Sequence, residues 1–442
     1  MKKFISILIG KFCVFVLDKL GRGSSFPGDI AYMLNKNILS DFKLPSKVIA
    51  VTGSSGKGST SKIISDVFKK FGNKVCYNDK GSNERSAIIA TLLKFSNLKG
   101  EINADVCVFE MDERYAKFVF PYINPNYVVI TNITRDQPPR QGHFDIVFEE
   151  ILKSLDENIT LIINGDDPYL QKFNLDNRFK VIYYGSSKLK YSYKDNKFSN
   201  LNITRCLKCH SKLDYNYYNI EYLGDYYCPS CDFKRPLISY EITNFDYDKS
   251  ILSINSKYNI YVNNDMLFNL YNIVAAFSCL SLYDLDQDMI SFYISEMEKD
   301  KKIYNKYKYN DKNVYVLNNK NENSTTFNQS ILYTSNDKGL KTIVIGWWQI
   351  SRRYDYDDLS WLYDIDFNLL NNVHKFIVCG PQRYDIAVAL KYNGFDEKKI
   401  VICNDMYSSK DDIKNSDGNI YAILNFDYIK PFNKVMEELK WR

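Results

Sequence analysis

The sequence predicts an α/β protein with two α/β domains, on three observations. The chain has 442 residues, which is longer than the roughly 100–200 residues of one ordinary domain. Its composition, 45% hydrophobic and 25% charged, is typical of a globular protein. Short runs of apolar, often β-branched residues alternate with helical patterns from residue 47 onward. Such near-continuous apolar strands, separated by helices, are typical of a parallel sheet that is covered on both faces.

The charge balance and the cysteines exclude two classes of protein. Lys and Arg number 58 and Asp and Glu 53, so the formal net charge is only +5, and we do not expect a nucleic-acid binder. Six of the ten cysteines are scattered through apolar stretches, and the other four form two close pairs. A disulfide-stabilised secreted domain would not show this distribution, whereas a protein of the reducing cytosol with one metal site would.

The first 46 residues are expected to form a separate helical segment. An apolar run follows two lysines within residues 1–20, as in a signal peptide, but Lys11, Asp18 and Lys19 interrupt it and no clean cleavage site follows. The run also lacks the roughly 18–20 uninterrupted apolar residues of a membrane span. It therefore predicts an amphipathic helix that ends near residues 21–23 and packs on the domain, with contact to a membrane surface as the alternative.

A larger central domain is expected over residues 47–298. Its buried-strand candidates are residues 48–51, 106–109, 128–130 and 161–163. A Gly/Ser-rich turn follows the first candidate and leads into a predicted helix that runs to about Phe71. Another helix is predicted over residues 269–282, where Ala275 and Ala276 would allow close packing.

The α/β pattern starts again in residues 299–442, which we expect to form a second and smaller domain. Its strand candidates are residues 314–317, 343–345, 376–378, 400–402 and 421–424. Residues 296–310 are charged and rich in Tyr and Lys, as expected of a linker or an exposed helix. The acidic stretch 355–367 is predicted to be a loop that enters a helix, with Asp358 or Ser360 as the cap.

A glycine-rich loop after the first predicted strand indicates nucleotide binding. It comprises Gly53, Ser54, Ser55, Gly56, Lys57, Gly58, Ser59 and Thr60. Glycines let the chain turn tightly, so that backbone N–H groups and the helix N-terminus face phosphate oxygens, and Lys57 adds a positive charge. Because Gly58 follows the lysine, a hydroxyl for Mg²⁺ has to come from Ser59 or Thr60. A plain strand–helix turn is the alternative.

Two cysteine pairs indicate a structural zinc site. Cys206 and Cys209 are followed, after 18 residues, by Cys228 and Cys231. Each pair places two thiolates on one side of a turn, and four thiolates surround Zn²⁺ with no position open for chemistry. We expect a zinc ribbon over residues 204–236, inserted in the central domain, with His210 as a neighbour rather than a ligand. Four incidental buried thiols are the alternative.

Acidic residues follow the second predicted strand. Glu110 comes directly after residues 106–109, so it is expected at the carboxyl edge of the sheet, where α/β proteins bind ligands and where a carboxylate suits Mg²⁺. For Asp112 and Glu113, a functional role and a solvated loop face are both open. His143 is expected to be a surface histidine, with a catalytic role as the alternative.

The glycine-rich loop resembles that of the Mur ligases and folylpolyglutamate synthases, ATP-dependent enzymes that form amide bonds. Further motifs narrow the resemblance to the MurT family, the synthetase subunits of lipid II isoglutaminyl synthase. They lie at residues 23–28, 78–83, 110–113, 131–140, 164–168, 271–276 and 380–385. The resemblance covers nearly the whole chain. It implies a Mur ligase-like central P-loop domain with an inserted four-cysteine zinc ribbon, and a Rossmann-like C-terminal α/β domain.

The resemblance implies an ATP-dependent carbon–nitrogen ligase of peptidoglycan biosynthesis. It would phosphorylate the α-carboxylate of D-glutamate in the lipid II stem peptide, and ammonia would displace the phosphate to give D-isoglutamine. A GatD-like glutaminase subunit would supply the ammonia as the partner in a heterodimer. The enzyme would work in the cytoplasm, at the inner face of the cell membrane, with ATP, Mg²⁺ and Zn²⁺ as cofactors.

The resemblance also implies roles for three residues outside the ribbon and the loop. Glu110 would hold the Mg²⁺ that bridges the ATP phosphates, and Asn272 would help to hold the nucleotide. Asp358 would face the glutaminase and complete a Cys-His-Asp triad across the interface, where a third group orients the histidine.

The sequence departs from the family pattern at four places. Gly58 stands where the family has threonine, and Glu322 where it has the proline of a nucleotide loop. Residues 346–350 replace an Asn-Asp-Asn stretch, and residues 135–140 contain prolines that the family lacks. Two alternatives therefore stay open: a related Mur or folylpolyglutamate-type ligase that adds an amino acid, and a scaffold that keeps the ribbon and the interface without turnover.

Overall fold

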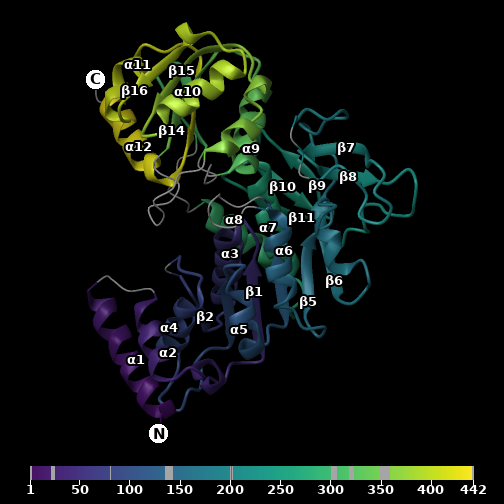
Figure 1. The fold of residues 1–442 in the computed structure, drawn as a ribbon, viewed down its shortest axis with the longest axis vertical. Helices are drawn as coiled ribbons and strands as arrows, with labels where there is room; N and C mark the ends of the chain where they lie inside the picture. The colour runs from purple at the N-terminus through teal and green to yellow at the C-terminus, as the bar shows by residue number, and fades with distance from the viewer. Residues whose placement is uncertain are drawn as a thin grey trace.

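The described part of the protein comprises two large sheets with their helices, a separate two-stranded hairpin and an N-terminal helical segment (Figure 1). The structure, a computed structural model, describes residues 2–20, 25–79, 81–134, 143–199, 201, 203–299, 306–317, 323–347 and 359–440. The C-terminal sheet lies at one end of the molecule and the N-terminal helices at the other, with the larger sheet between them (Figure 1). The α/β class expected from the alternation of apolar runs and helices is confirmed.

The larger sheet has nine strands in the order β11-β10-β9-β6-β5-β4-β1-β3-β2. Their bounds are β1 (Lys47–Thr52), β2 (Val75–Tyr77), β3 (Val106–Glu110), β4 (Tyr127–Ile130), β5 (Thr160–Asn164), β6 (Lys180–Ser186), β9 (Tyr240–Asp246), β10 (Ile251–Ile254) and β11 (Tyr258–Tyr261). All neighbours from β2 to β9 pair in parallel, and β10 and β11 add an antiparallel edge. The four strands predicted for this domain are β1, β3, β4 and β5, and they are consecutive neighbours in the sheet.

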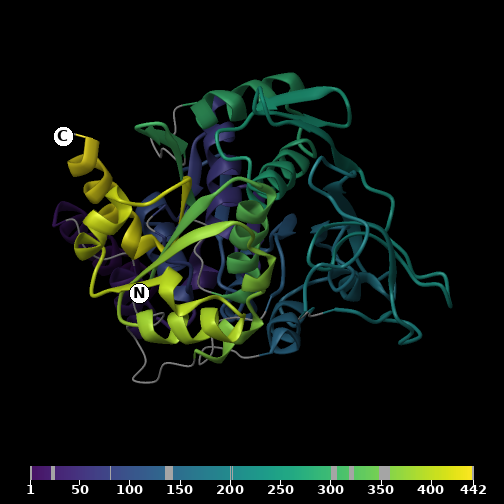
Figure 2. The same cartoon turned by 90° about the horizontal axis from the view of Figure 1, so that it is seen from above.

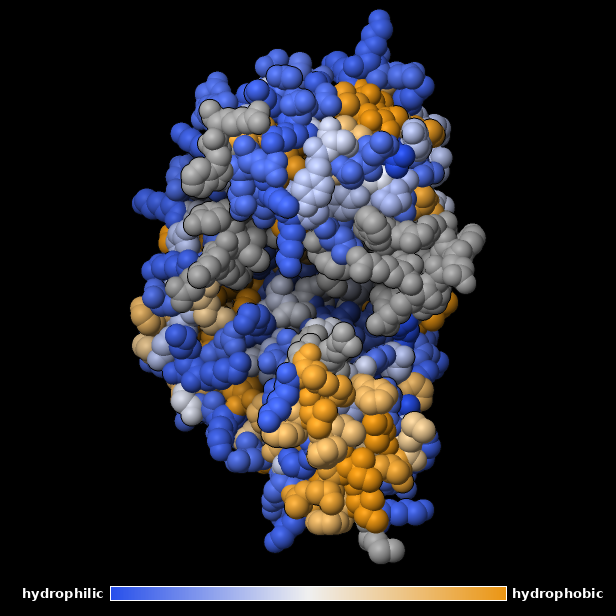
Figure 3. All heavy atoms as spheres, turned by 90° about the vertical axis from the view of Figure 1, so that its left-hand side faces the viewer, coloured by the Kyte–Doolittle hydropathy of each residue, from blue (hydrophilic) through white to orange (hydrophobic). Residues whose placement is uncertain are grey.

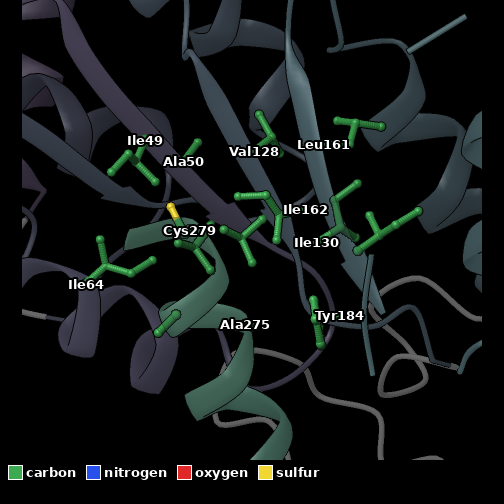
Figure 4. Close-up of a cluster of buried hydrophobic side chains, with 14 of the residues drawn as sticks. Ile49, Ala50, Ile64, Val128, Ile130, Leu161, Ile162, Tyr184, Ala275 and Cys279 are labelled. Atoms are coloured by element: carbon green, nitrogen blue, oxygen red, sulfur yellow. The ribbon is translucent and has the colours of Figure 1, made fainter. Parts of the chain in front are cut away.

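Helices bury the strands of this sheet. They are α3 (Lys57–Lys70), α4 (Arg85–Phe95), α5 (Ala116–Ile123), α6 (Phe144–Leu152), η2 (Leu170–Asn174), α7 (Leu267–Leu280) and α8 (Gln287–Lys299). Figure 4 shows Ile64 of α3 and Ala275 and Cys279 of α7 beside strand residues such as Ile49 and Ile162. Cys279 is fully buried, and burial raises its pKa. Five of the six scattered cysteines are buried, and Cys13 is half-buried.

The smaller sheet has six strands in the order β12-β13-β17-β14-β15-β16. Its elements are β12 (Lys306–Tyr309), β13 (Lys312–Leu317), α9 (Ser324–Asn336), β14 (Lys341–Gly346), η3 (Ser360–Asp364), η4 (Phe367–Leu369), β15 (Val373–Cys379), α10 (Arg383–Tyr392), η5 (Glu397–Lys399), β16 (Ile400–Cys403), η6 (Tyr407–Ser409), α11 (Lys410–Lys414), β17 (Asn419–Leu424) and α12 (Phe426–Lys440). In this sheet β12 and β13 pair antiparallel, and all the other neighbouring strands pair in parallel. All five predicted strands are present. The predicted cap of the acidic segment is wrong, because Leu359 precedes η3 and Ser360 already belongs to it.

A hairpin of β7 (Asp214–Ile220) and β8 (Leu223–Tyr227) stands apart from both sheets. The chain leaves the large sheet at the end of β6 and returns at β9, and these two strands are direct neighbours. The intervening segment is therefore an insertion that leaves the sheet pairing unbroken. It projects from the side of the molecule in two perpendicular views (Figures 1 and 2).

The N-terminal segment comprises α1 (Lys2–Lys19), α2 (Phe26–Leu34) and η1 (Ile38–Asp41). Helix α1 packs against α2 and α4, so the predicted helix that lies on the domain is confirmed. Among the described residues, no helix combines the length and the apolar character needed to cross a bilayer.

Candidate functional site

The glycine-rich loop connects the end of β1 to the start of α3. Gly53 (φ 122°) and Gly56 (φ 82°) have the positive φ that glycine adopts without strain. Side chains at these positions would also collide with neighbours, because a Cβ would lie 2.5 Å from Thr131 Oγ1 or 2.2 Å from Asn272 Oδ1. Glycine at both positions therefore lets the loop lie directly against the end of β4 and against α7.

The loop borders a cavity of about 480 Å³. Its lining residues are Ser54, Ser55, Gly56, Lys57, Gly58, Ser59, Gly81, Glu110, Asn132, Asn264, Phe268, Asn269, Asn272 and Thr326. Six of the eight loop residues singled out in the sequence therefore meet Glu110 and Asn272 around one space. Gly53 and Thr60 lie outside the lining.

Side chains that follow β4 hold the loop in place. Thr131 Oγ1 donates to the carbonyl of Ser55 at 2.6 Å, and Asn132 Oδ1 accepts from the N–H of Ser55 at 3.0 Å. Ser54 Oγ accepts from the N–H of Thr134 at 3.0 Å. The Thr-Asn pair at the end of β4 thus positions the backbone that would face a phosphate.

Lys57 lies among carboxylates at the bottom of the loop. Its Nζ is 3.1 Å from Glu113 Oε2, and the two side chains are 11% and 4% exposed. Burial disfavours the charged form of this lysine, but the carboxylates of Glu113, Asp112 and Glu110 outweigh burial and raise its pKa. The alternative of a solvated loop face for Asp112 and Glu113 is wrong, because both residues are buried.

Glu110 ends β3 beside the first turn of α3. Asn83 Nδ2 donates to Glu110 Oε1 at 2.9 Å, while the side chain of Asn78 binds the N–H and the C=O of Glu110, each at 2.9 Å. The other carboxylate oxygen, Oε2, lies so near Gly58 that a Cβ there would be 3.0 Å away. The glycine that departs from the family pattern therefore leaves room for the Glu110 carboxylate at the mouth of the loop.

The two candidate hydroxyls lie in different surroundings. Ser59 is exposed and lines the cavity. Thr60 is fully buried, and its Oγ1 has no hydrogen-bond partner among the described residues. Of these two candidates, Ser59 lines the cavity with Lys57 and Glu110, and Thr60 does not.

Both large domains contribute to the cavity. Phe268 and Asn272 lie on α7, and Asn264 on the segment before it, whereas Thr326 lies in the first turn of α9. Asn323 caps α9 by accepting from the N–H of Thr326 at 2.9 Å. A ligand in this space would therefore contact the two domains at once.

The four paired cysteines come together at one end of the inserted hairpin. Their Sγ atoms all lie within 4.8 Å of one another, with Cys206 and Cys231 3.5 Å apart and Cys209 and Cys228 3.4 Å apart. Four thiolates around Zn²⁺ at about 2.3 Å would be about 3.8 Å apart, so the donor set and its spacing fit zinc. His210 is not part of this cluster, in agreement with the prediction.

Backbone groups of the two cysteine turns point at sulfur atoms. The N–H of Lys208 donates to Cys206 Sγ at 3.3 Å, and the N–H of Ser230 donates to Cys228 Sγ at 3.4 Å. Such bonds favour the thiolate form that a metal needs. The incidental-thiol alternative does not account for this convergence of four sulfur atoms.

A buried network anchors the insertion beside the cavity. Arg235, just after the last cysteine turn, donates through Nε to Asp166 Oδ1 at 2.6 Å. The same carboxylate accepts from the Tyr271 hydroxyl at 2.6 Å and from the N–H of Ser186 at 2.7 Å. Tyr271 directly precedes Asn272 on α7. The sequence showed these residues only as separate motifs, because nothing in their spacing joins positions that are 69 and 105 residues apart.

His143, a candidate from the sequence, is not among the residues that line the cavity. His143 caps α6, its ring Nδ1 accepts from the N–H of Asp145 at 3.2 Å, and its side chain is 58% exposed, so it is a surface histidine as expected. Asp358 and Glu322 lie outside the described residues.

Comparisons with known proteins match both large domains. Residues 51–226 match the Mur ligase middle domain, and residues 321–428 match the MurT ligase C-terminal domain. The chain is 28% identical to the lipid II isoglutaminyl synthase (glutamine-hydrolyzing) subunit MurT of Staphylococcus aureus strain COL, over 98% of this chain and 97% of that protein. It is 25% identical to MurT of Streptococcus pneumoniae strain R6, over 99% and 97% of the two chains.

Solved structures share the fold. A pseudomurein peptide ligase type C from Methanothermus fervidus superposes with a TM-score of 0.68 at 21% identity, over 93% of this chain and 84% of that one. MurF ligase from Thermotoga maritima, solved in complex with ADP, superposes with a TM-score of 0.60 at 17% identity, over 94% and 85%. The chain is therefore a Mur ligase-like protein that resembles the MurT subunits over nearly its whole length.

Proposed function

We propose that this protein is the ATP-dependent synthetase subunit of an amidotransferase that acts on lipid II. It would phosphorylate the α-carboxylate of D-glutamate in the stem peptide, and ammonia would displace the phosphate to give D-isoglutamine. The observation that carries the proposal is one cavity that joins the glycine-rich loop, Glu110 and Asn272. Full-length similarity to the MurT subunits supports the choice of substrate.

The cavity offers a distinct partner for each part of a nucleoside triphosphate. The N-terminus of α3 and the ammonium group of Lys57 attract phosphate oxygens. Glu110 and the hydroxyl of Ser59 are the hard oxygen donors that would hold Mg²⁺, which neutralises charge on the phosphates when it is bound. Asn272 lies against Gly56 at the other side of the loop and would hold the nucleotide.

Glu113 would act on the reaction through Lys57. It holds the lysine by a buried ion pair at 3.1 Å, so that Nζ lies at the bottom of the loop before any ligand binds. Such positioning in advance lowers the cost of reorganising charge when phosphate is transferred from ATP to the carboxylate.

Zinc would have a structural role. A site of four cysteine ligands leaves no coordination position open, and the cluster is part of the insertion rather than of the cavity lining. We infer that Cys206, Cys209, Cys228 and Cys231 fix the hairpin that carries Arg235 to Asp166.

Ammonia would come from a glutaminase subunit in a heterodimer. The subunit names of the MurT relatives imply an assembly with a second subunit. Asp358 would contribute to the glutaminase triad from the C-terminal domain. We place the complex in the cytoplasm at the inner face of the membrane, where lipid II is presented.

Phosphate release by the purified pair of subunits tests the reaction. With lipid II, ATP and glutamine we expect phosphate release that falls about hundredfold or more in Lys57→Met, because one charged donor to the transferred phosphoryl group is lost. Lys62→Met is the matched control, since it removes a lysine from the same helix whose side chain is 67% exposed. Ammonium salts should replace glutamine for the synthetase alone.

Other outcomes would identify the alternatives. Dependence of phosphate release on an added amino acid instead of ammonia would establish a ligase of the amino-acid-adding type. Absence of release under every condition, with the two subunits still associated, would establish a scaffold without turnover.

A further inference from the structure

The outer face of the two N-terminal helices is apolar. Its large exposed side chains are Phe4, Ile5, Leu8, Ile9, Phe12, Phe15, Leu20, Phe26, Met33 and Leu34, which together we call the N-terminal apolar face. Figure 3 shows this end of the molecule covered by hydrophobic residues, while most of the remaining visible surface is hydrophilic. Single exposed apolar residues are ordinary, but a contiguous group of this kind marks a contact surface.

The residues of α1 repeat at helical spacing along one stripe. Phe4, Leu8, Phe12 and Phe15 follow each other at intervals of four, four and three residues, and each of them is at least 46% exposed. This spacing defines one face of a helix. In an ordinary surface helix such a stripe faces the core, whereas here it faces outward.

Contacts on the inner side fix this orientation. At Gly10 the helix comes so close to α2 and α4 that a Cβ would lie 2.6 Å from Leu93 Cδ1 and 3.2 Å from Ala31 Cβ. Lys11, the charged residue in the middle of α1, reaches inward and donates through Nζ to the carbonyl of Leu93 at 2.8 Å. Lys3 likewise donates to the carbonyl of Asp41 at 2.9 Å. The inner side is therefore held by these hydrogen bonds together with the buried Ile7 and the close contact at Gly10, and turning the apolar stripe inward would break them.

Positive charge is concentrated in the same segment. Residues 1–46 contain seven Lys and Arg and three Asp, a net charge of +4, and the remaining residues contain 51 Lys and Arg against 50 Asp and Glu. Nearly the whole formal charge of the chain thus comes from about a tenth of its length. Lys2, Lys19 and Lys36 are exposed at or just beyond the ends of α1 and α2, where they flank the apolar face and outnumber the exposed acids Asp18 and Asp29.

We propose that the N-terminal apolar face docks on the surface of a lipid bilayer that contains anionic headgroups. Helices α1 and α2 would lie in the plane of the interface, with the apolar side chains among the upper acyl chains and the flanking lysines at the headgroups. The concentrated positive charge favours this occupant over a second copy of the chain, whose identical face would repel it. The proposal goes beyond the ligase reaction and does not depend on it.

Vesicle co-sedimentation of the full-length protein tests the apolar contact. We expect binding to phosphatidylcholine vesicles that contain phosphatidylglycerol, and at least about tenfold weaker binding by the double variant Leu8→Gln/Phe12→Gln. Both side chains are exposed, so the variant should keep the melting temperature of the parent. Leu237→Gln is the matched control, because Leu237 is a 92% exposed apolar residue far along the chain, near the inserted hairpin.

The electrostatic part has its own readout. Lys2→Gln/Lys19→Gln should weaken binding to the anionic vesicles, and added salt should do the same, while binding to vesicles of phosphatidylcholine alone should be weak for all variants. Equal vesicle binding by the parent and Leu8→Gln/Phe12→Gln would overturn the proposal. A parent that forms oligomers in solution, binds no vesicles and becomes monomeric on Leu8→Gln/Phe12→Gln would overturn it as well, and would assign the face to contact between copies.

Discussion

At the scale of single residues, the glycine at position 58 and the acid at position 110 depend on each other. A Cβ at position 58 would lie 3.0 Å from Glu110 Oε2, so the small residue and the inward-facing carboxylate occur together. Of the two hydroxyl residues that follow Gly58, Ser59 is the one that lines the cavity. The departure from Lys-Thr to Lys-Gly is thus matched by its surroundings and is compatible with a working phosphate site.

Glu221 is a second residue that its surroundings alter: they raise the pKa of its carboxyl group. It lies in the tight turn between β7 and β8 with φ 47°, is 5% exposed, and accepts from Asn328 Nδ2 of α9 at 3.2 Å. Burial raises its pKa from 4.5 to about 7, and the carboxylate of Asp366 adds to the rise, whereas the hydrogen bond from Asn328 opposes it. The folded state therefore keeps a proton on Glu221 that the unfolded chain has lost.

The raised pKa of Glu221 predicts a loss of stability as the pH rises. The contribution of Glu221 to the free energy of unfolding is highest below pH 4.5, where its carboxyl group is protonated in both states. This contribution falls as the pH rises from 4.5 to about 7, because Glu221 ionises in the unfolded chain while burial keeps it protonated in the folded protein. Glu221→Gln should be more stable than the parent at pH 8, by up to about 3 kcal/mol, and similar to it at pH 4.5. Denaturant unfolding at both pH values measures this difference. Glu397→Gln, with a side chain 76% exposed, should show no such pH-dependent gain, and a Glu221→Gln curve parallel to the parent would contradict the prediction.

At the scale of elements, a buried ion pair between Arg235 and Asp166 holds the inserted hairpin against the large sheet. The Asp166 carboxylate is fully buried, and the Arg235 guanidinium that pairs with it is 13% exposed. Arg235 also donates to the carbonyl of Ser186 and to Glu241, each at 3.1 Å. Because Tyr271 shares the Asp166 carboxylate, the hairpin and helix α7 are joined through a single group.

Arg235→Met should destabilise the protein by about 3–5 kcal/mol, since it leaves a buried carboxylate without its counter-charge. The double variant Asp166→Asn/Arg235→Met should recover part of this loss, because the uncompensated charge is removed. Thermal and denaturant unfolding measure both. Arg178→Met serves as the control, because its side chain is 37% exposed and its ion pair with Glu157 is 3.8 Å long. A loss no larger in Arg235→Met than in this control would show that the ion pair does not anchor the hairpin.

The hairpin should contain one zinc ion per chain. Cys206→Ser should lose the metal and weaken the docking of the hairpin, because three thiolates no longer complete the tetrahedron. Elemental analysis of the purified protein measures the zinc. Cys13→Ser, at a half-buried position in α1, should keep it. A parent protein without zinc would refute the ribbon.

At the scale of the whole molecule, the cavity lies where the two large domains meet. Phe268 and Asn272 approach it from α7, and Thr326 approaches it from α9. Met266, just before α7, is buried in the core of the C-terminal domain rather than in its own. The domains are therefore packed together beside the cavity, and a ligand there would add contacts to both.

Co-purification with a glutaminase subunit, followed by Asp358→Asn, tests the proposed assembly. We expect glutamine hydrolysis to fall strongly while the two subunits stay associated, because the triad loses the group that orients its histidine. The measurements are glutamate release and size-exclusion chromatography. Asp385→Asn, which removes an exposed acid from α10, should change neither. Unchanged hydrolysis in Asp358→Asn would remove this residue from the triad.

The most apolar strands, the glycine-rich loop and the four paired cysteines could be predicted because their signals are local. Apolar β-branched runs mark buried strands, and two close cysteine pairs mark a thiolate site whatever the fold around them. The antiparallel edge of β10 and β11 was not predicted, because its half-exposed strands lack continuous apolar runs. The contacts of Asp112, Glu113 and Asp166 were also missed, since a carboxylate in a loop has the same sequence signature whether it is buried or solvated.

Local sequence patterns were enough to predict the class of fold, the glycine-rich loop and the four cysteines that come together in the insertion. Whether a given side of a helix or loop faces the core or the solvent depends instead on tertiary contacts. Helical spacing shows that Phe4, Leu8 and Phe12 share one side of α1, but it does not show whether that side meets the core. The close approach at Gly10 and the inward hydrogen bonds of Lys11 set this orientation, and they involve residues more than 80 positions away in the chain.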